Sequence, residues 1–239
     1  MASPRHPRRP AMRARRPVAA RPVVARPVLT RPVVVAALTA VVAVSLAGCL
    51  TGERPSFLDD QPVSAETGNE AIDAVLERLD AATLAEFTAE YDILTKLGNQ
   101  TSVASVVHAP VGRRSVTIDD VRFIEGSGQP ATCDLATGEC RASIDDASIS
   151  DIGVTHRFYA DDFARRLRVD ANRRIGEPVA YTITAAGLPA LCVDVPVSGG
   201  TKVYCAIEAG PLALYDGNDV NIALSHYTDV PDESAFQTS

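Results

Sequence analysis

Apolar residues recur along residues 69–82 with the spacing of a helix that has one buried face. The positions i, i+3, i+4 and i+7 of this stretch are occupied by Ile72, Val75, Leu76 and Leu79. On a helix these positions form a continuous apolar stripe, which must pack against another element. Thr67 and Glu70 have the capping-box spacing, so we expect the helix to begin there and to end near Ala82.

The period changes to two after this helix, which predicts strands. Phe87, Tyr91 and Ile93 alternate with polar residues, so a strand over 86–97 should have one apolar face and one wet face. Similar runs separated by turn-forming residues predict antiparallel strands at 101–108, 113–118, 121–125, 179–185, 191–197, 201–207, 212–215 and 220–227. A second helix is expected at about 159–172, and the whole pattern predicts an α+β fold.

The second predicted helix carries the only basic cluster in the sequence after residue 48. Its members are Arg165, Arg166, Arg168, Arg173 and Arg174. Asp161, Asp162 and Asp170 stand four residues before Arg165, Arg166 and Arg174, a spacing that pairs charges along an exposed helix face. We expect such pairing to outweigh the alternative, in which the cluster meets anionic lipid headgroups.

Residues 1–48 have the pattern of an export signal. They hold nine Lys or Arg and no Asp or Glu, and Arg-Pro-Val recurs at 16–18, 21–23, 26–28 and 31–33. The apolar run 33–46 would reach about 21 Å as a helix, which is short against the roughly 30 Å of a bilayer core. A basic region followed by a short apolar region and small residues is typical of a signal peptide behind an Arg/Pro-rich leader.

The end of this segment, Leu46-Ala47-Gly48-Cys49, resembles the bacterial lipobox, in which signal peptidase II cleaves before a lipidated cysteine. We expect Cys49 to be the first mature residue and to carry acyl chains such as palmitate. Several acyl chains hold a protein at a bilayer stably, which predicts a lipoprotein of the cell envelope, anchored to the extracytoplasmic face of the cell membrane. An ordinary signal peptide followed by an accidental cysteine is the alternative.

The rest of the chain divides by its pattern into three parts. Residues 49–68 lack a sustained period and are expected to form a flexible tether. Residues 69–227 should form a single domain, long enough to bury about 70% of its unfolded surface. Residues 228–239 are expected to be a frayed tail. Either Met1 or Met12 is the start, since residues 1–11 add nothing that the signal requires.

Four cysteines follow Cys49, an even number that favours disulfides in an exported protein. Cys133 and Cys140 flank one expected turn, and Cys192 and Cys205 flank another. Facing positions of a hairpin bring two cysteines close enough to bond, so we predict the disulfides Cys133–Cys140 and Cys192–Cys205. A zinc site of four thiolates, which the lack of any CxxC disfavours, and reduced buried thiols are the alternatives.

Charge and motif content argue against several function classes. Residues 49–239 hold 14 Lys or Arg and 30 Asp or Glu, a balance of −16 that is unlike that of a nucleic-acid-binding protein. His108, His156 and His226 are isolated, and we expect them at the surface or at strand ends. Neither HExxH nor GxSxG occurs, so we expect no enzyme, no metal and no cofactor.

The order of the elements resembles that of the lipoprotein-localisation-factor superfamily, and within it the LolA-like and LppX/LprG-like lipoproteins of actinobacteria. Acylated Cys49, the tether, the passage 72–97 and the closing passage 192–227 carry the likeness, which covers nearly the whole mature chain. The resemblance implies a strongly bent antiparallel sheet, an unclosed half-barrel, whose concave side is covered by helices. It also implies that a lipid or glycolipid can lie between sheet and helix.

Two functions follow. The first is a non-catalytic, lipid-anchored protein that binds or carries a lipid or another apolar ligand. The lining of its cavity would be Ile72, Val75, Leu76, Leu79, Phe87, Tyr91 and Ile93. The second is a membrane-anchored protein-interaction module with a solid core and no ligand, whose protein partner the sequence does not name. A pocket of several hundred Å³ would favour the first function, and a close-packed interior would favour the second.

Overall fold

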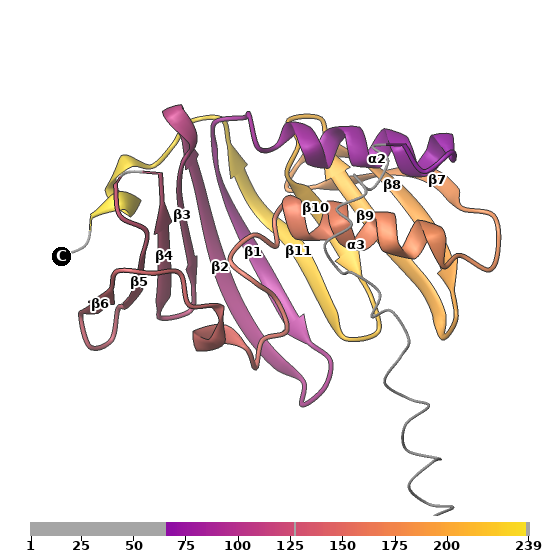
Figure 1. The fold of residues 1–239 in the computed structure, drawn as a ribbon. Coiled ribbons are helices and arrows are strands. Elements are labelled where there is room, and N and C mark those ends of the chain that lie inside the picture. Colours follow the sequence, from indigo (N-terminus) through magenta and orange to yellow (C-terminus); the bar gives the residue numbers. More distant parts are fainter. Residues whose placement is uncertain (1–65, 127, 238–239) are drawn as a thin grey trace, which may run out of the picture. The chain divides into compact units, whose positions relative to one another are not determined.

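The structure is a computed structural model that describes residues 66–126 and 128–237, all within the unit Asp59–Ser239. The signal segment, the lipidation site Cys49 and most of the predicted tether lie outside the described residues. Figure 1 shows the described part as a large curved sheet with two helices on one face. The α+β class and the bent, unclosed antiparallel sheet are as expected.

Eleven strands of the described chain form one antiparallel sheet. They are β1 Phe87–Thr95, β2 Gln100–Ala109, β3 Arg113–Ile118, β4 Val121–Glu125, β5 Ala131–Asp134, β6 Glu139–Arg141, β7 Val179–Ala185, β8 Leu188–Val197, β9 Gly200–Ile207, β10 Leu212–Asp216 and β11 Val220–Thr228. The helices are α2 Glu70–Ala81 and α3 Asp161–Asn172, with short 3-10 helices η2 Pro110–Gly112, η3 Asp146–Ile149 and η4 Glu233–Phe236. The strands expected at 113–118, 121–125 and 179–185 have the predicted bounds.

The strand order is β6-β5-β4-β3-β2-β1-β11-β10-β9-β8-β7, so consecutive strands are neighbours in the sheet within β1–β6 and within β7–β11. The one addition is the pair β1–β11, which joins the meander β1–β6 to the meander β7–β11. Its register shifts between Glu90 and Tyr91, as at a bulge. Strands β6 and β7 form the two edges of the sheet, which is why the half-barrel stays unclosed.

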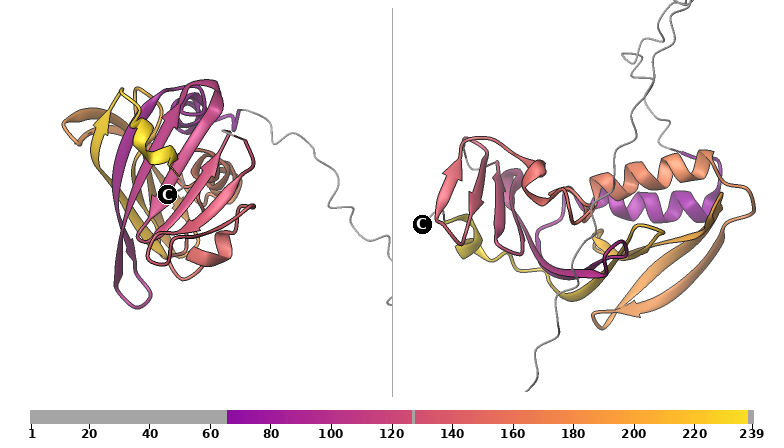
Figure 2. Two further views of the ribbon diagram at one scale, coloured as in Figure 1. Left: turned by 90° about the vertical axis from the view of Figure 1, so that its left-hand side faces the viewer. Right: turned by 90° about the horizontal axis from the view of Figure 1, so that it is seen from below.

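Two kinds of structure cover the concave face of the sheet (Figures 1 and 2). Helices α2 and α3 lie over the half that contains β7–β11. Residues 142–160, which contain only the short η3, lie over strands of the other half. Thr95 Oγ1 donates to the carbonyl of Ile152 at 2.7 Å, and the ring of Phe158 meets that of Tyr91 edge-on with centroids 5.0 Å apart. An irregular segment thus extends the cover that the helices provide.

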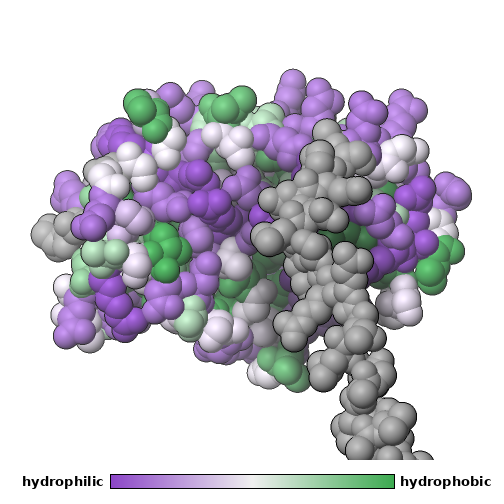
Figure 3. All heavy atoms as spheres, viewed as in Figure 1, coloured by the Kyte–Doolittle hydropathy of each residue, from purple (hydrophilic) through white to green (hydrophobic). Residues whose placement is uncertain are grey.

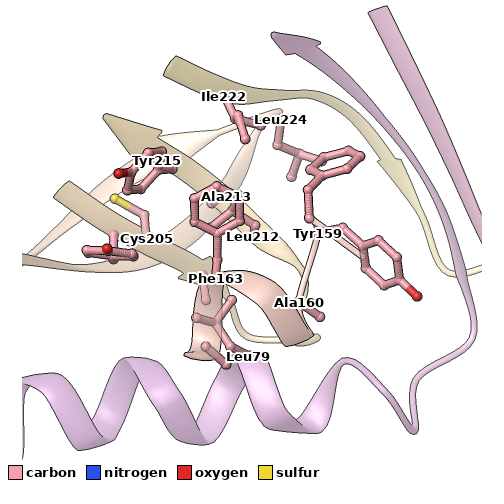
Figure 4. Packing of buried hydrophobic residues seen from close by; sticks show 14 of the residues in the cluster. Leu79, Tyr159, Ala160, Phe163, Cys205, Leu212, Ala213, Tyr215, Ile222 and Leu224 are labelled. Carbon is pink, nitrogen blue, oxygen red and sulfur yellow. The ribbon is translucent and has the colours of Figure 1, made fainter. Parts of the chain in front are cut away.

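The apolar stripe of α2 is buried against the sheet, as its spacing predicts. Its members are Ile72, Val75, Leu76 and Leu79, which expose 0–1% of their surface. Figure 4 shows Leu79 pointing from α2 toward Phe163 of α3, with Leu212 and Tyr215 of β10 on the sheet side. These residues belong to one continuous hydrophobic cluster, so both helices share a core with the sheet.

Helix α2 begins with a different cap from the one the sequence suggests. Asn69 is the N-cap, and its side-chain oxygen accepts the backbone N–H of Ile72 at 3.1 Å. Thr67 instead donates to the carboxylate of Asp73, from its backbone N–H at 2.7 Å and from its hydroxyl at 2.8 Å. The capping-box prediction was wrong because asparagine directly before the helix is a stronger cap than threonine.

The tail that we expected to be frayed is packed as far as the structure describes it. Strand β11 runs to Thr228, and η4 then lies beside β3. The guanidinium of Arg113 donates to the carboxylate of Glu233 at 2.7 and 3.0 Å. Ser115 Oγ donates to the carbonyl of Ala235 at 2.7 Å. The partners on β3 are about 120 residues away in sequence, so the pattern of the tail alone does not reveal them.

Both predicted disulfides are confirmed. Cys133 stands directly opposite Cys140 on β5 and β6, and Cys192 stands opposite Cys205 on β8 and β9. The first bond ties the three-residue edge strand β6 to its neighbour. The second lies within the hydrophobic core. Because all four sulfurs are bonded, the alternatives of a four-thiolate zinc site and of reduced thiols are not realised.

The turn between β9 and β10 comes so close to α2 that glycine is needed there. Gly210 has a φ of +113°, and a Cβ on it would lie 2.5 Å from the backbone nitrogen of Ala82. We expect Gly210→Ala to lower the free energy of unfolding by about 2–4 kcal/mol, since a clash adds to left-handed strain. Gly187→Ala is the control, because Gly187 also has a positive φ, of +78°, but no atom within 4 Å of that Cβ. Equal losses for both variants in urea unfolding would contradict the close approach.

Candidate functional site

An open groove of about 1050 Å³ runs along α3. Helix α3 lines one side, the β8–β9 and β10–β11 turns line the other, and η3 with the residues after it lines one end. Phe158, Phe163 and Val197 lie at its base, each exposing no more than 6% of its surface. In Figure 3 the face that carries α2 and α3 is mostly hydrophilic, with separate apolar patches. The groove therefore combines an apolar base with charged sides.

Helix α3 separates the residues that face the core from those that face the groove. Its buried apolar residues are Phe163, Ala164, Leu167 and Ala171. Arg165, Val169 and Arg173 are exposed and line the groove. Arg173 is the C-cap of α3 and follows Arg165 by eight residues, so the backbones of the two arginines lie about 12 Å apart along the helix axis. Val169 lies midway between them and exposes 40% of its surface.

A buried carboxylate fixes α3 to the sheet. Asp170 exposes 4% of its surface and accepts two hydrogen bonds from Lys202 Nζ, both at 2.8 Å, and one from the hydroxyl of Tyr204. Burial, together with the bond to Asp170, raises the pKa of Tyr204 above its usual value. A buried carboxylate is costly unless it is paired, so these donors allow Asp170 to sit beneath the groove.

A second contact between α3 and the sheet engages Arg166. Its guanidinium donates to the carboxylate of Asp219 at 3.0 Å and to the hydroxyl of Tyr215 at 3.0 Å. The same group lies 5.1 Å from the ring centroid of Phe163 and 5.2 Å from that of Tyr215, within the range of cation–π attraction. Arg166 is therefore committed to the contacts that seat α3 on β10 and β11.

Among the remaining charged residues of the groove, the carboxylates have hydrogen-bond partners and two arginines do not. Asp146 accepts from the backbone N–H of His156 at 2.9 Å and lies 2.8 Å from its Nδ1, and Asp162 accepts from the hydroxyl of Thr155. Every carboxylate of the groove thus has a donor from the chain itself. Arg165 and Arg173, by contrast, have no hydrogen-bond or ion-pair partner for their side chains among the residues that the structure describes.

The ion pairs predicted within α3 do not form. Asp161 lies 3.7 Å from Arg114 on β3, and Asp170 binds Lys202 on β9. Arg174 donates to the carbonyl of Ala171 at 2.8 Å instead of reaching Asp170. The spacing permits helical pairs worth only about 0.2–0.5 kcal/mol each, and Asp161 and Asp170 instead meet partners on the sheet whose side chains are only 23% and 20% exposed.

The residues predicted to line a ligand cavity lie in a solid core. They are Ile72, Val75, Leu76, Leu79, Phe87, Tyr91 and Ile93, with exposures of 0–1%. A side chain beside an internal space larger than a water molecule would expose surface to that space, so no such space touches these seven. None of them lines the α3 groove, although Ile93 borders an open recess of about 480 Å³ with Asp92 and Leu94. Their ligand role receives no support from this packing.

A polar cluster around the buried His156, which packs against β4, was not anticipated. His156 exposes 8% of its surface, so the expectation of a surface histidine was wrong. Its Nδ1 lies 2.8 Å from Asp146 and its Nε2 lies 3.6 Å from Glu125, which also accepts from Arg157 at 2.9 Å. The ring stacks on Phe123 with centroids 5.4 Å apart. No sequence spacing signals this cluster, because β4 is separated by about thirty residues from the segment that it holds.

Two further properties bear on the function classes. No group of three or more His, Cys, Asp or Glu side chains within residues 66–126 and 128–237 is arranged to hold a metal ion. Over the same ranges, no helix has both the length and the apolar character needed to cross a membrane.

Comparisons with known proteins give only distant structural similarity. No protein-family model and no curated protein sequence matches the chain. A structure of MucB in complex with MucA(peri) aligns at 12% identity and a TM-score of 0.43, covering 70% of this chain and 59% of the other. A structure of MucB aligns at 14% identity and a TM-score of 0.43, covering 71% of this chain and 63% of the other. A MucA/MucB complex of Pseudomonas aeruginosa aligns at 15% identity and a TM-score of 0.40, covering 70% of this chain and 60% of the other. This chain spans about three-fifths of those chains, and similarity this low identifies neither a family nor a function.

Buried tyrosines predict a loss of stability at high pH. Burial raises the pKa of Tyr159 to about 12 and raises those of Tyr91 and Tyr204 above the usual value of 10. Above pH 10 the unfolded chain therefore loses protons that the folded chain keeps, so the free energy of unfolding should fall as pH rises from 10 toward 12. Tyr204→Phe should reduce this slope in denaturant unfolding between pH 8 and 11.5. A slope equal to that of the unaltered protein would contradict the assignment.

Proposed function

We propose that this chain is a lipid-anchored, extracytoplasmic lipoprotein whose folded domain binds a protein partner and catalyses no reaction. The lipobox sequence at Cys49 supports the anchor, although it lies outside the described residues. The two disulfides support an oxidising compartment, where such bonds form and persist. Partner binding is the second of the two functions that the sequence suggests, and the core is the reason for preferring it.

The packing between α2 and the sheet is the observation that carries this proposal. A site for an apolar ligand needs a pocket of several hundred Å³, and in this fold the space for it would lie between helix and sheet. The four stripe residues of α2 pack within one cluster and expose 0–1% of their surface, and the same holds for Phe87, Tyr91 and Ile93 on β1, which the segment 142–160 covers. Binding therefore falls to the outer surface, where the α3 groove offers about 1050 Å³.

Membership of the lipoprotein-localisation-factor superfamily is part of the same proposal. Its support is the unclosed antiparallel sheet of eleven strands with two helices on its concave face, which is the architecture that the resemblance implied. The narrower likeness to LppX/LprG-like lipoproteins stays a prediction.

Replacing Leu76 by tryptophan tests whether there is space beneath α2. Leu76 exposes 1% of its surface, so an indole has no room, and Leu76→Trp should lower the free energy of unfolding by about 1–3 kcal/mol. Leu84, which follows α2 and exposes 88%, provides the control, because Leu84→Trp should change stability by less than about 0.5 kcal/mol. Denaturant unfolding measures both variants. Unchanged stability of Leu76→Trp, combined with loss of fluorescent fatty-acid binding, would restore the carrier function.

Replacing Cys49 by alanine tests the anchor. The variant lacks the sulfur that receives diacylglycerol, so it should leave the membrane fraction or accumulate as uncleaved precursor. Fractionation of cells labelled with an alkyne analogue of palmitate measures both outcomes. Ser56→Ala, in the predicted tether, should label and fractionate like the unaltered chain. Labelling of Cys49→Ala at the normal level would refute the lipobox assignment.

A further inference from the structure

Two arginines of the α3 groove carry hydrogen-bonding capacity that the protein does not use. Arg165 and Arg173 are exposed, line the groove, and have no side-chain partner among the described residues. Each guanidinium presents N–H donors in a planar fork that matches a carboxylate, and it stays charged at any physiological pH. Among the described residues, no hydrogen-bond acceptor faces either guanidinium group.

The other charges of the groove do not supply those acceptors. Four acidic and four basic side chains line it, so its formal charge balances. The acidic side chains are all engaged, whereas two of the basic ones are not. Asp170 binds Lys202, and Asp219 binds Arg166. Asp146 and Asp162 accept hydrogen bonds from the segment 155–156. The two groove side chains that lack hydrogen-bond partners among the described residues are therefore both cationic donors, which favours an anionic ligand.

The spacing of the two arginines favours a particular shape of ligand. They lie about 12 Å apart along the helix axis, and an extended chain advances about 3.3 Å per residue, so positions i and i+4 of a peptide span about 13 Å. Side chains at i, i+2 and i+4 of an extended chain point the same way. An acidic residue at each end would meet an arginine, and the residue midway would lie over Val169, which exposes 40% of its surface.

We infer that the α3 groove docks an extended acidic segment of a protein partner, with carboxylates at i and i+4 bound by Arg165 and Arg173 and an apolar residue at i+2 over Val169. The inference rests on the proposed function, since it gives the chemistry of the partner that an interaction module would bind. Phe158, Phe163 and Val197 at the base of the groove expose 0–6% of their surface, so Val169 provides most of the apolar contact.

An anionic membrane surface fits this site less well. Anionic lipid surfaces attract clusters of about four to eight Lys or Arg, whereas only Arg165 and Arg173 of the groove cations lack a partner among the described residues. An extended peptide is narrow enough to enter the groove.

A peptide selection tests the inference with no partner protein in hand. A library of random 12-residue peptides is selected on the acylated mature chain, purified in detergent. We expect enriched peptides to carry two acidic residues four positions apart with an apolar residue midway. A synthetic peptide of that consensus should bind about ten-fold more weakly to the Arg165→Gln/Arg173→Gln variant, and more weakly still at high salt.

Arg174→Gln is the matched control for this experiment. It removes one positive charge, half of the change in the double variant, just beyond the end of α3, but Arg174 bonds to the carbonyl of Ala171 and does not line the groove. Its affinity for the peptide should equal that of the unaltered chain. Thermal unfolding of the double variant should also be unchanged, because neither arginine has a partner to lose.

Three results would overturn the inference. One is a selection that yields no peptide or shows no acidic bias. Another is a consensus peptide that binds the double variant as tightly as the unaltered chain. The third is charge-dependent binding to phosphatidylglycerol vesicles without peptide enrichment, which would assign the arginines to a lipid surface. A different result would contradict the proposed function while leaving the inference standing. In that case lipid would be found beneath α2, and the groove would still select acidic peptides.

Discussion

Burial of the apolar stripe of α2 against the concave face of the sheet is the interaction on which the rest of the structure depends. A strongly bent sheet presents an apolar inner face, and that face must be covered by protein or by a ligand. Here Ile72, Val75, Leu76 and Leu79 provide the cover from α2 and expose 0–1% of their surface. Because the inner space is filled by side chains, the fold can be stable without a guest molecule.

The position of α3 follows from this filled core and determines the candidate site. Phe163 and Leu167 join the core, while Asp170 and Arg166 bind polar partners on β9, β10 and the β10–β11 turn. These contacts place the helix across the sheet with Arg165, Val169 and Arg173 facing outward beside two hairpin turns. The groove is thus a consequence of how α3 is seated, and its free donors are the side chains that this seating leaves without partners.

The sequence predicts the features that depend on neighbours close in the chain. Hairpin strands such as Val179–Ala185 and the disulfides Cys133–Cys140 and Cys192–Cys205 could be predicted because turn residues and spacing encode them locally. The pairing β1–β11, the packing of η4 on β3 and the cluster around His156 could not, since each joins segments that are distant in sequence. The basic cluster on α3 is visible in the sequence. Which of its arginines are free could not be predicted, because Asp80 and Asp219, which bind Arg168 and Arg166, lie on other elements.

Native mass spectrometry of the protein extracted from its own membrane tests the central claim, that the interior is filled by its own side chains, most directly. If the core is solid, the folded protein should have the mass of the chain from Cys49 with its acyl anchor and two disulfides, and nothing more. The mass should stay the same when the protein is unfolded in the gas phase. A folded form that is heavier by the mass of a lipid, and that releases this mass only on unfolding, would contradict a solid core.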